Sequence, residues 1–270
     1  MIFFCAQHVF AQSLPYPQRT LWGSTSYALG GAGVSTFSGM DAFSINPAGL
    51  SGFRDKSAAG GFYSRLPDDI STWSVGVVDG VSPINAGAQF KWTDFGDSSR
   101  QQIQLAMAYP FAWGSFGVGI HTEKLKGLSG PGNGWHFTSS SGLIINAGQA
   151  ISIGASVLSL LDKENDSLYP PLLRLGASFQ YPGSFRVAFD AFRRFKMAQQ
   201  DWNYSTGLEV FWQDWFGISG GYHFNNSDEA SFWATGLFLR APRIDVGATY
   251  QQRTKSSSAR GFTTEVTLKF

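Results

Sequence analysis

The end of the chain decides the fold: residues 243–251 read Arg-Ile-Asp-Val-Gly-Ala-Thr-Tyr-Gln, and residues 261–270 read Gly-Phe-Thr-Thr-Glu-Val-Thr-Leu-Lys-Phe. In both stretches, apolar residues alternate with polar or small ones. Residues 184–193, Ser-Phe-Arg-Val-Ala-Phe-Asp-Ala-Phe-Arg, follow the same rule. Successive side chains of a β-strand point to opposite faces, so a period of two predicts strands with one apolar and one polar face.

The same alternation extends back along most of the chain. It predicts fourteen segments of about nine to twelve residues, the first at Ser57–Arg65 and the last at Gly261–Phe270. A tilted strand needs about 9–11 residues to cross a bilayer. Most even-numbered connections are tight, such as Pro182-Gly183, whereas odd-numbered ones such as residues 124–134 are longer and polar. Short turns at one end and longer loops at the other are typical of outer-membrane barrels.

Composition indicates which way the apolar faces point. Charged residues make up 14% of the 270-residue chain, aromatic residues 16%, and there are 32 glycines, whereas soluble domains carry about 25% charged residues. A soluble sandwich would turn its apolar faces inward, but a membrane barrel turns them toward lipid. The sequence therefore predicts an all-β fold, a 14-stranded antiparallel transmembrane β-barrel over residues 56–270, surrounded by the lipid of the bacterial outer membrane.

One uncharged stretch, residues 137–161, is long enough to be considered as a membrane helix. Asn146, Gly148 and Gln149 interrupt it, and residues 151–157 alternate with a period of two. This pattern favours two strands joined by a tight turn over one helix.

Both ends of the chain carry signals for export and assembly. Phe270, Leu268 and Val266 alternate in the last segment, which resembles the C-terminal signature that the barrel assembly machinery reads, so this machinery is an expected partner. Residues 1–11 end in Val9-Phe10-Ala11 and resemble the remnant of a secretory signal peptide.

Residues 12–55 do not alternate and form a separate unit before the barrel. They contain Leu29-Gly-Gly-Ala-Gly33 and then the motif Asn46, Pro47, Ala48, Gly49 and Leu50. No strand, glycine loop and helix follow one another here, so the glycines do not predict a dinucleotide site. A glycine-rich stretch followed by Asn-Pro-Ala-Gly-Leu, directly before the first strand, resembles the N-terminal hatch of FadL-like outer-membrane barrels. That family includes long-chain fatty-acid transporters and the PorV/PorQ proteins of type IX secretion.

Later segments resemble the PorV-like branch, notably Pro170-Pro-Leu-Leu-Arg-Leu-Gly176 and Gly217-Ile-Ser-Gly-Gly-Tyr222. The resemblance implies a hatch in the lumen and two alternative functions. One is the passage of small hydrophobic solutes across the outer membrane, which predicts a continuous apolar path or a lateral gap. The other is a scaffold that docks secretion-system or surface-assembly proteins, which predicts a blocked lumen. A general ion porin fits less well, because the inserted segment and the small lumen residues argue against a wide aqueous pore.

The two halves of the predicted barrel line the lumen differently. Lumen positions of the first seven strands are small, such as Gly87, Gly117 and Gly154, and small residues let another backbone approach closely. Lumen positions of the later strands are polar or charged: Arg174, Arg186, Asp190, Glu209, Asp245 and Glu265. We therefore expect residues 24–53 to pack against the first strands, with Ala32 close to Gly117, and to leave the charged strands facing a narrow space.

No catalytic pattern is present in the sequence. His121 and His223 fall on lumen positions without metal-ligand spacing, there is no Gly-x-Ser-x-Gly elbow, and Cys5 is the single cysteine. The net charge of +1 gives no reason to expect a nucleic-acid partner. The sequence predicts neither an enzyme nor a protein with a metal or other cofactor.

Overall fold

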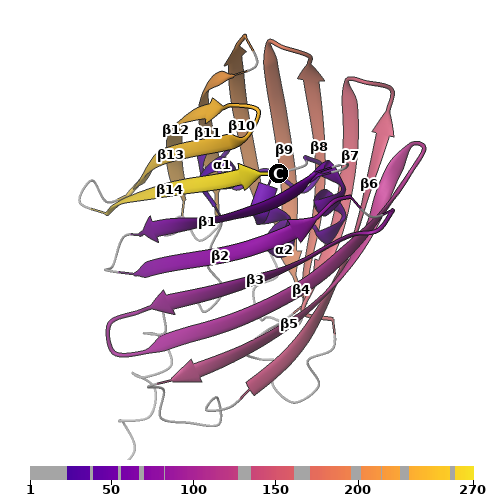
Figure 1. Cartoon of the computed structure of the whole chain (residues 1–270). Helices are drawn as coiled ribbons and strands as arrows, with labels where there is room; N and C mark the ends of the chain where they lie inside the picture. Colours follow the sequence, from indigo (N-terminus) through magenta and orange to yellow (C-terminus); the bar gives the residue numbers. More distant parts are fainter. Residues whose placement is uncertain are drawn as a thin grey trace, which may run out of the picture.

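The computed structural model describes residues 23–36, 39–53, 56–66, 70–81, 83–126, 135–160, 171–195, 202–213, 215–225, 231–255 and 259–270. It shows a closed barrel of fourteen antiparallel strands, in which each strand pairs with its neighbours in the sequence and the last strand pairs with the first (Figure 1). This confirms the predicted fold class. The predicted signal-peptide remnant, residues 1–11, lies outside the described residues.

The strands are β1 (Ser57–Arg65), β2 (Ser71–Asp79), β3 (Asn85–Asp94), β4 (Ser99–Phe111), β5 (Gly114–Lys126), β6 (Trp135–Ala147), β7 (Ile151–Leu158), β8 (Leu172–Tyr181), β9 (Phe185–Arg194), β10 (Asn203–Trp212), β11 (Phe216–Phe224), β12 (Phe232–Arg240), β13 (Ile244–Arg253) and β14 (Arg260–Lys269). We call β1–β7 the early wall and β8–β14 the late wall.

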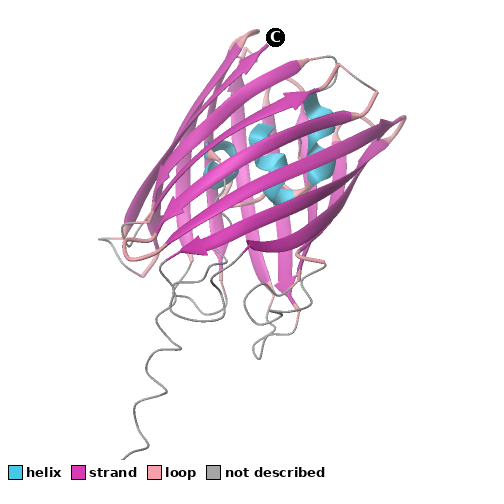
Figure 2. Cartoon of the chain, turned by 60° about the horizontal axis from the view of Figure 1, so that its bottom comes forward, coloured by secondary structure: helices cyan, strands magenta, loops and turns pink. Residues whose placement is uncertain are grey.

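Four short helices precede the strands: α1 (Ser24–Ala28), η1 (Gly39–Asp41), α2 (Ala42–Ile45) and η2 (Pro47–Phe53). All four lie inside the barrel, enclosed by the strands (Figure 2). Among the residues that the structure describes, no helix is both long and apolar enough to cross a membrane. We call residues 23–53 the hatch.

Closure of the barrel depends on the pairing of β1 with β14. Their register runs without a break from Ala58 opposite Lys269 to Arg65 opposite Phe262. The backbone N–H of Phe270 extends the pairing with a hydrogen bond of 2.8 Å to the carbonyl oxygen of Ser57. Because the sheet closes, no strand is left with an unpaired edge, which a bilayer core would not tolerate.

The apolar faces of the strands point outward, as predicted from the alternation. In β9, Val187 and Phe189 are exposed while Arg186 and Asp190 are buried in the barrel. In β14, Phe262, Val266 and Leu268 are exposed. The outer surface thus carries large apolar side chains all the way around, far beyond the patch of a few hundred Å² that a soluble monomer exposes.

The two ends of the barrel differ in their connections. At one end, which we call the short-turn end, residues 112–113, 148–150, 182–184, 213–215 and 241–243 join the strands. This end also holds Ser57 and Phe270. At the opposite, long-loop end, longer stretches of sequence separate the strands, as between β5 and β6, β7 and β8, and β9 and β10.

Candidate functional site

The hatch crosses the lumen from the early wall to the late wall. Its last element, η2, contacts β2–β6, whereas its first element, α1, contacts β11–β14. The hatch is therefore the candidate functional site, because anything that passes through the lumen must pass it.

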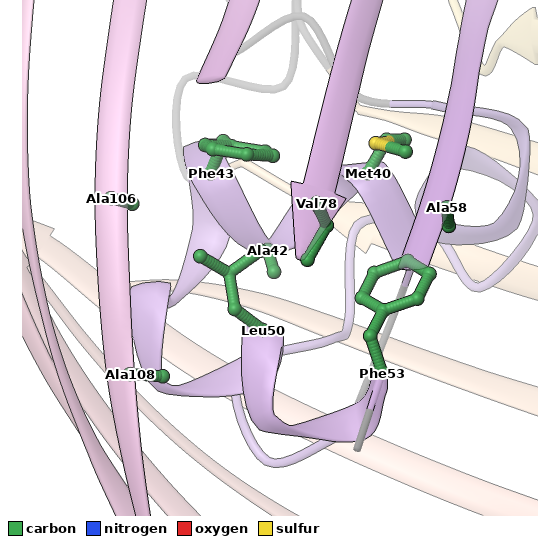
Figure 3. Close-up of a cluster of buried hydrophobic side chains, with 9 residues drawn as sticks. All are labelled: Met40, Ala42, Phe43, Leu50, Phe53, Ala58, Val78, Ala106 and Ala108. Atoms are coloured by element: carbon green, nitrogen blue, oxygen red, sulfur yellow. The ribbon is translucent and has the colours of Figure 1, made fainter. Parts of the chain in front are cut away.

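The contact with the early wall combines an apolar cluster with hydrogen bonds such as those from Ser115 to the carbonyl oxygen of Ala48 and from Ser156 to that of Ile45. Five hatch side chains pack there against small wall residues (Figure 3), and together they are Met40, Ala42, Phe43, Leu50, Phe53, Ala58, Val78, Ala106 and Ala108. Two glycines allow the backbones to meet. A Cβ at position 117 would lie 2.3 Å from the backbone nitrogen of Ala48, and one at position 142 would lie 1.8 Å from Oδ1 of Asn46. This part of the hatch lies where the small lumen residues predicted it.

Asn46 connects the hatch to itself and to the wall. Its Nδ2 donates a hydrogen bond of 2.7 Å to the carbonyl oxygen of Val34 and lies 3.3 Å from the carbonyl oxygen of Leu143 in β6. Its Oδ1 accepts hydrogen bonds from the backbone N–H of Ala48 and the hydroxyl of Ser152. Pro47 then begins η2, a position that suits its fixed φ and missing N–H. The other members of the motif, Gly49 and Leu50, are buried in the hatch.

The contact with the late wall, which was not predicted, includes hydrogen bonds to buried carboxylates as well as apolar packing. Oδ2 of Asp190 accepts hydrogen bonds from the backbone N–H groups of Gly33 (2.8 Å) and Val34 (3.0 Å). The expectation that residues 24–53 would pack only against the first strands is therefore wrong. Between α1 and η1, the hatch has backbone N–H groups with no partner in a helix or strand. A carboxylate of the late wall accepts hydrogen bonds from them.

The expected proximity of Ala32 and Gly117 is also wrong. Ala32 packs against Leu29 and Ala188 beside the late wall, whereas Gly117 faces Pro47 and Ala48. The two positions lie on opposite sides of the hatch because residues 29–34 follow the late wall before the chain returns to the early wall.

Two carboxylates hold the beginning of α1. Asp41 of the hatch accepts from the backbone N–H groups of Gly23 and Ser26, and Glu265 of β14 accepts from that of Ser24 at 2.9 Å. The first N–H groups of a helix have no partner within it, so these acids supply the missing acceptors. Burial raises the pKa of Asp41, while hydrogen bonds from Ser26 and Gly23 and the charge of Lys91 act in the opposite direction.

A second buried cluster lies on the long-loop side of the hatch. It joins Tyr27, Val34 and Ile45 of the hatch to residues of the barrel mouth, and we call it the outer cluster: Tyr27, Val34, Ile45, Leu66, Ile70, Phe95 and Phe232. Its aromatic side continues along the late wall. The ring of His223 stacks between Phe232 (5.0 Å between centroids) and Phe192 (5.3 Å), and the guanidinium of Arg174 lies 5.3 Å from the centre of Phe192.

The other predicted lumen residues lie toward the short-turn end. Arg186 and Glu209 form a buried ion pair, which Arg240 joins through Glu209. Asp245 pairs with Lys269 at 2.6 Å. Sequence reasoning missed Arg240, although its position two residues after the lumen-facing Phe238 was the signal for it.

Both predicted lumen histidines have ordinary polar partners on separate walls. His121 lies 2.9 Å from Gln104 and 2.7 Å from Ser140, and His223 lies 3.0 Å from Ser205. Within the described part of the chain, no group of three or more potential ligands could hold a metal ion.

Comparison with solved structures identifies the architecture. The toluene transporter TbuX of Ralstonia pickettii superposes with a TM-score of 0.69 over 93% of this chain and 97% of that chain, at 13% identity. The fold is that of a FadL-like barrel. The toluene transporter TodX of P. putida gives the same score and identity over 93% and 98% of the two chains, and the monoaromatic hydrocarbon channel CymD gives 0.66 at 14% identity over 92% and 96%.

No family model matches the chain, and no curated protein matches its sequence. The identities of 13–14% carry the FadL-like fold alone. The resemblance to the PorV/PorQ branch stays a prediction.

We predict that the hatch becomes less firmly held as the pH rises. A raised pKa means that the protonated form of Asp41 is favoured in the hatch, so its contribution is present at low pH and is lost as the pH rises through that pKa. Hydrogen exchange of residues 23–36 measured across a pH series, corrected for intrinsic exchange, should show falling protection. Asp41→Asn should reduce this response, whereas Asp245→Asn should retain it. Protection that does not change with pH in the natural sequence would contradict the prediction.

We also predict that Gly142→Ala displaces the hatch. The new Cβ would overlap Oδ1 of Asn46, and overpacking of this kind lowers the free energy of unfolding by about 1–3 kcal/mol. Planar-bilayer recordings should show a larger conductance for Gly142→Ala than for the natural chain. Gly220→Ala is the matched control, because a Cβ there would have no neighbour closer than 3.9 Å. Equal conductance of the two variants would show that the hatch does not seal the lumen at Asn46.

Proposed function

We propose that the chain forms a passage for small hydrophobic solutes across the bacterial outer membrane. The observation that carries the proposal is the outer cluster, a group of apolar side chains on the long-loop side of the hatch in which Phe95 and Phe232 are only partly buried and can therefore be contacted by a solute. A solute that leaves water gains free energy in proportion to the apolar surface it buries. Toluene and monoaromatic hydrocarbons are the solutes named for the solved barrels of the same fold.

Connection lengths support one orientation in the membrane. Outer-membrane barrels have short turns on the periplasmic side and longer loops outside. In that orientation, the outer cluster faces the external medium and Phe270 lies at the periplasmic side, where the assembly machinery would meet it. Bilayer lipid then surrounds the exposed apolar belt.

Passage requires the hatch to move, because the strand pairing of the described residues leaves no break in the wall. Each neighbouring pair of strands runs in continuous register over its paired residues, β2 with β3 from Ser71 to Asp79 for example. η2 packs closely against the early wall, whereas Asp190 and Glu265 hold residues 24–34 through hydrogen bonds from the hatch backbone. We therefore expect residues 23–36 to move while η2 stays in place.

The continuous strand pairing of the wall also favours the second candidate function, a scaffold that docks secretion or surface-assembly proteins. Such a role needs no passage, and a closed wall around a hydrogen-bonded hatch agrees with a blocked lumen. The two functions differ in one measurable property, which is solute flux.

Uptake of toluene into proteoliposomes tests the proposal. We expect the natural chain to accelerate uptake over protein-free vesicles and Phe232→Ala to reduce this acceleration severalfold, because the variant removes part of the outer cluster. Phe179→Ala is the matched control, since Phe179 is exposed on the outer surface of β8. If neither the natural chain nor an Asp190→Asn/Glu265→Gln variant accelerates uptake, passage is excluded and the scaffold is favoured.

A further inference from the structure

The late wall continues toward the short-turn end beyond the level that the hatch covers. Most of its lumen glycines touch the hatch: a Cβ at position 207 or 221 would lie within 2.7 Å of Leu29, and one at position 236 would lie 2.7 Å from Cβ of Ala28. Gly217 differs. A Cβ there would have no neighbour closer than 3.4 Å, and its nearest atoms belong to β10 rather than to the hatch.

A charged cluster lies beside Gly217, at the level that the hatch leaves uncovered. Glu209 is fully buried and accepts from two guanidiniums, with Oε2 toward Arg186 and Oε1 at 2.8 Å from Nη2 of Arg240. Arg186 is nine-tenths buried, but 32% of the Arg240 side chain is exposed. The cluster is therefore buried on the wall side and accessible from the lumen at Arg240.

The cluster carries one positive charge in excess among the described residues. Two guanidiniums share the single carboxylate of Glu209, and the neighbouring pair of Asp245 and Lys269 is neutral. Within the described chain, Nε of Arg186 is buried without a hydrogen-bond partner. Buried charges are normally compensated, so a surplus cation with an accessible edge favours an anion from solution.

Aromatic rings determine how such an anion can approach. The guanidinium of Arg240 lies 4.9 Å from the centre of Phe211 and 6.0 Å from that of Phe238. In the strand register, Gly217 lies between these two phenylalanines. A guanidinium stacked against rings keeps its edge for hydrogen bonds, and a carboxylate matches that edge in plane with two acceptors. Phe238 and Gly217 are buried, whereas Phe211 is half-buried, so Phe211 offers the accessible apolar surface beside it.

We propose that Arg240, with Arg186 and Phe211, forms a binding site for small aromatic carboxylates on the short-turn side of the hatch. The carboxylate accepts from the exposed part of the Arg240 guanidinium, and the ring of the ligand lies against Phe211. This proposal rests on the proposed function only for the orientation that places the site on the periplasmic side. It adds aromatic acids, which reach the site from that side, to the solutes that the barrel binds.

Titration of benzoate into the purified full-length chain in detergent, followed by calorimetry, tests the site. We expect saturable binding by the natural chain, at least tenfold weaker binding by Arg240→Gln, and a similar loss with Phe211→Leu, which removes the aromatic ring and keeps every charge. Lys269→Gln is the matched control, because it removes a different cation at this end and should change the affinity less than twofold. Heat-modified migration on gels checks that each variant is a folded barrel.

Neutral and non-aromatic probes complete the test. Benzamide and acetate should each bind at least tenfold more weakly than benzoate. Equal binding of benzamide would show that no carboxylate is recognised, and equal binding of acetate would show that the rings contribute nothing. An equal loss of affinity in Lys269→Gln and Arg240→Gln would show that binding depends on the overall positive charge and not on Arg240. Each of these outcomes, or no binding of benzoate at all, overturns the proposal. Toluene uptake is measured independently, so a failure of either proposal leaves the other intact.

Discussion

The structure depends on one constraint: a backbone surrounded by hydrocarbon must pair all of its N–H and C=O groups within the protein. Closure of the sheet through β1 and β14 meets this constraint. Once the sheet is closed, the period-two alternation separates the side chains into an outward apolar set and an inward polar set. The side chains that line the lumen are then largely polar, and the hatch occupies space that water would otherwise fill.

Both walls pack against the hatch and form hydrogen bonds with it, but the bonds to buried carboxylates come from the late wall. The early wall offers small side chains, so backbone approaches backbone and apolar side chains fill the remaining space around Leu50 and Phe53. The late wall offers acceptors, and Asp190 and Glu265 bind backbone N–H groups that the irregular hatch cannot satisfy itself. Apolar packing of this kind is insensitive to pH, whereas hydrogen bonds to buried carboxylates respond to protonation. Protonation can therefore change how firmly the hatch is attached on its late-wall side.

Much of the barrel could be predicted from the sequence because strand alternation is a local property. The faces of β9 and β14 follow directly from residues 184–193 and 261–270. The hatch contacts could not be predicted in the same way. The bonds from Gly33 and Val34 to Asp190 join residues more than 150 positions apart, and no local pattern encodes them. The alternation after Phe238 places Arg240 on the lumen side, but its pairing with Glu209 of β10 could not be predicted, because that contact joins different strands.

Spin labels on the two faces of β9 test the central claim most directly. With the chain in lipid vesicles, labels at positions 187 and 189 should collide with oxygen, which concentrates in the bilayer, and be shielded from a water-soluble nickel chelate. Labels at positions 188 and 190 should show low accessibility to both, because the hatch and the wall cover them. If positions 187 and 189 were instead open to the nickel chelate, or shielded from both reagents, the apolar faces would not meet lipid and the account would be wrong.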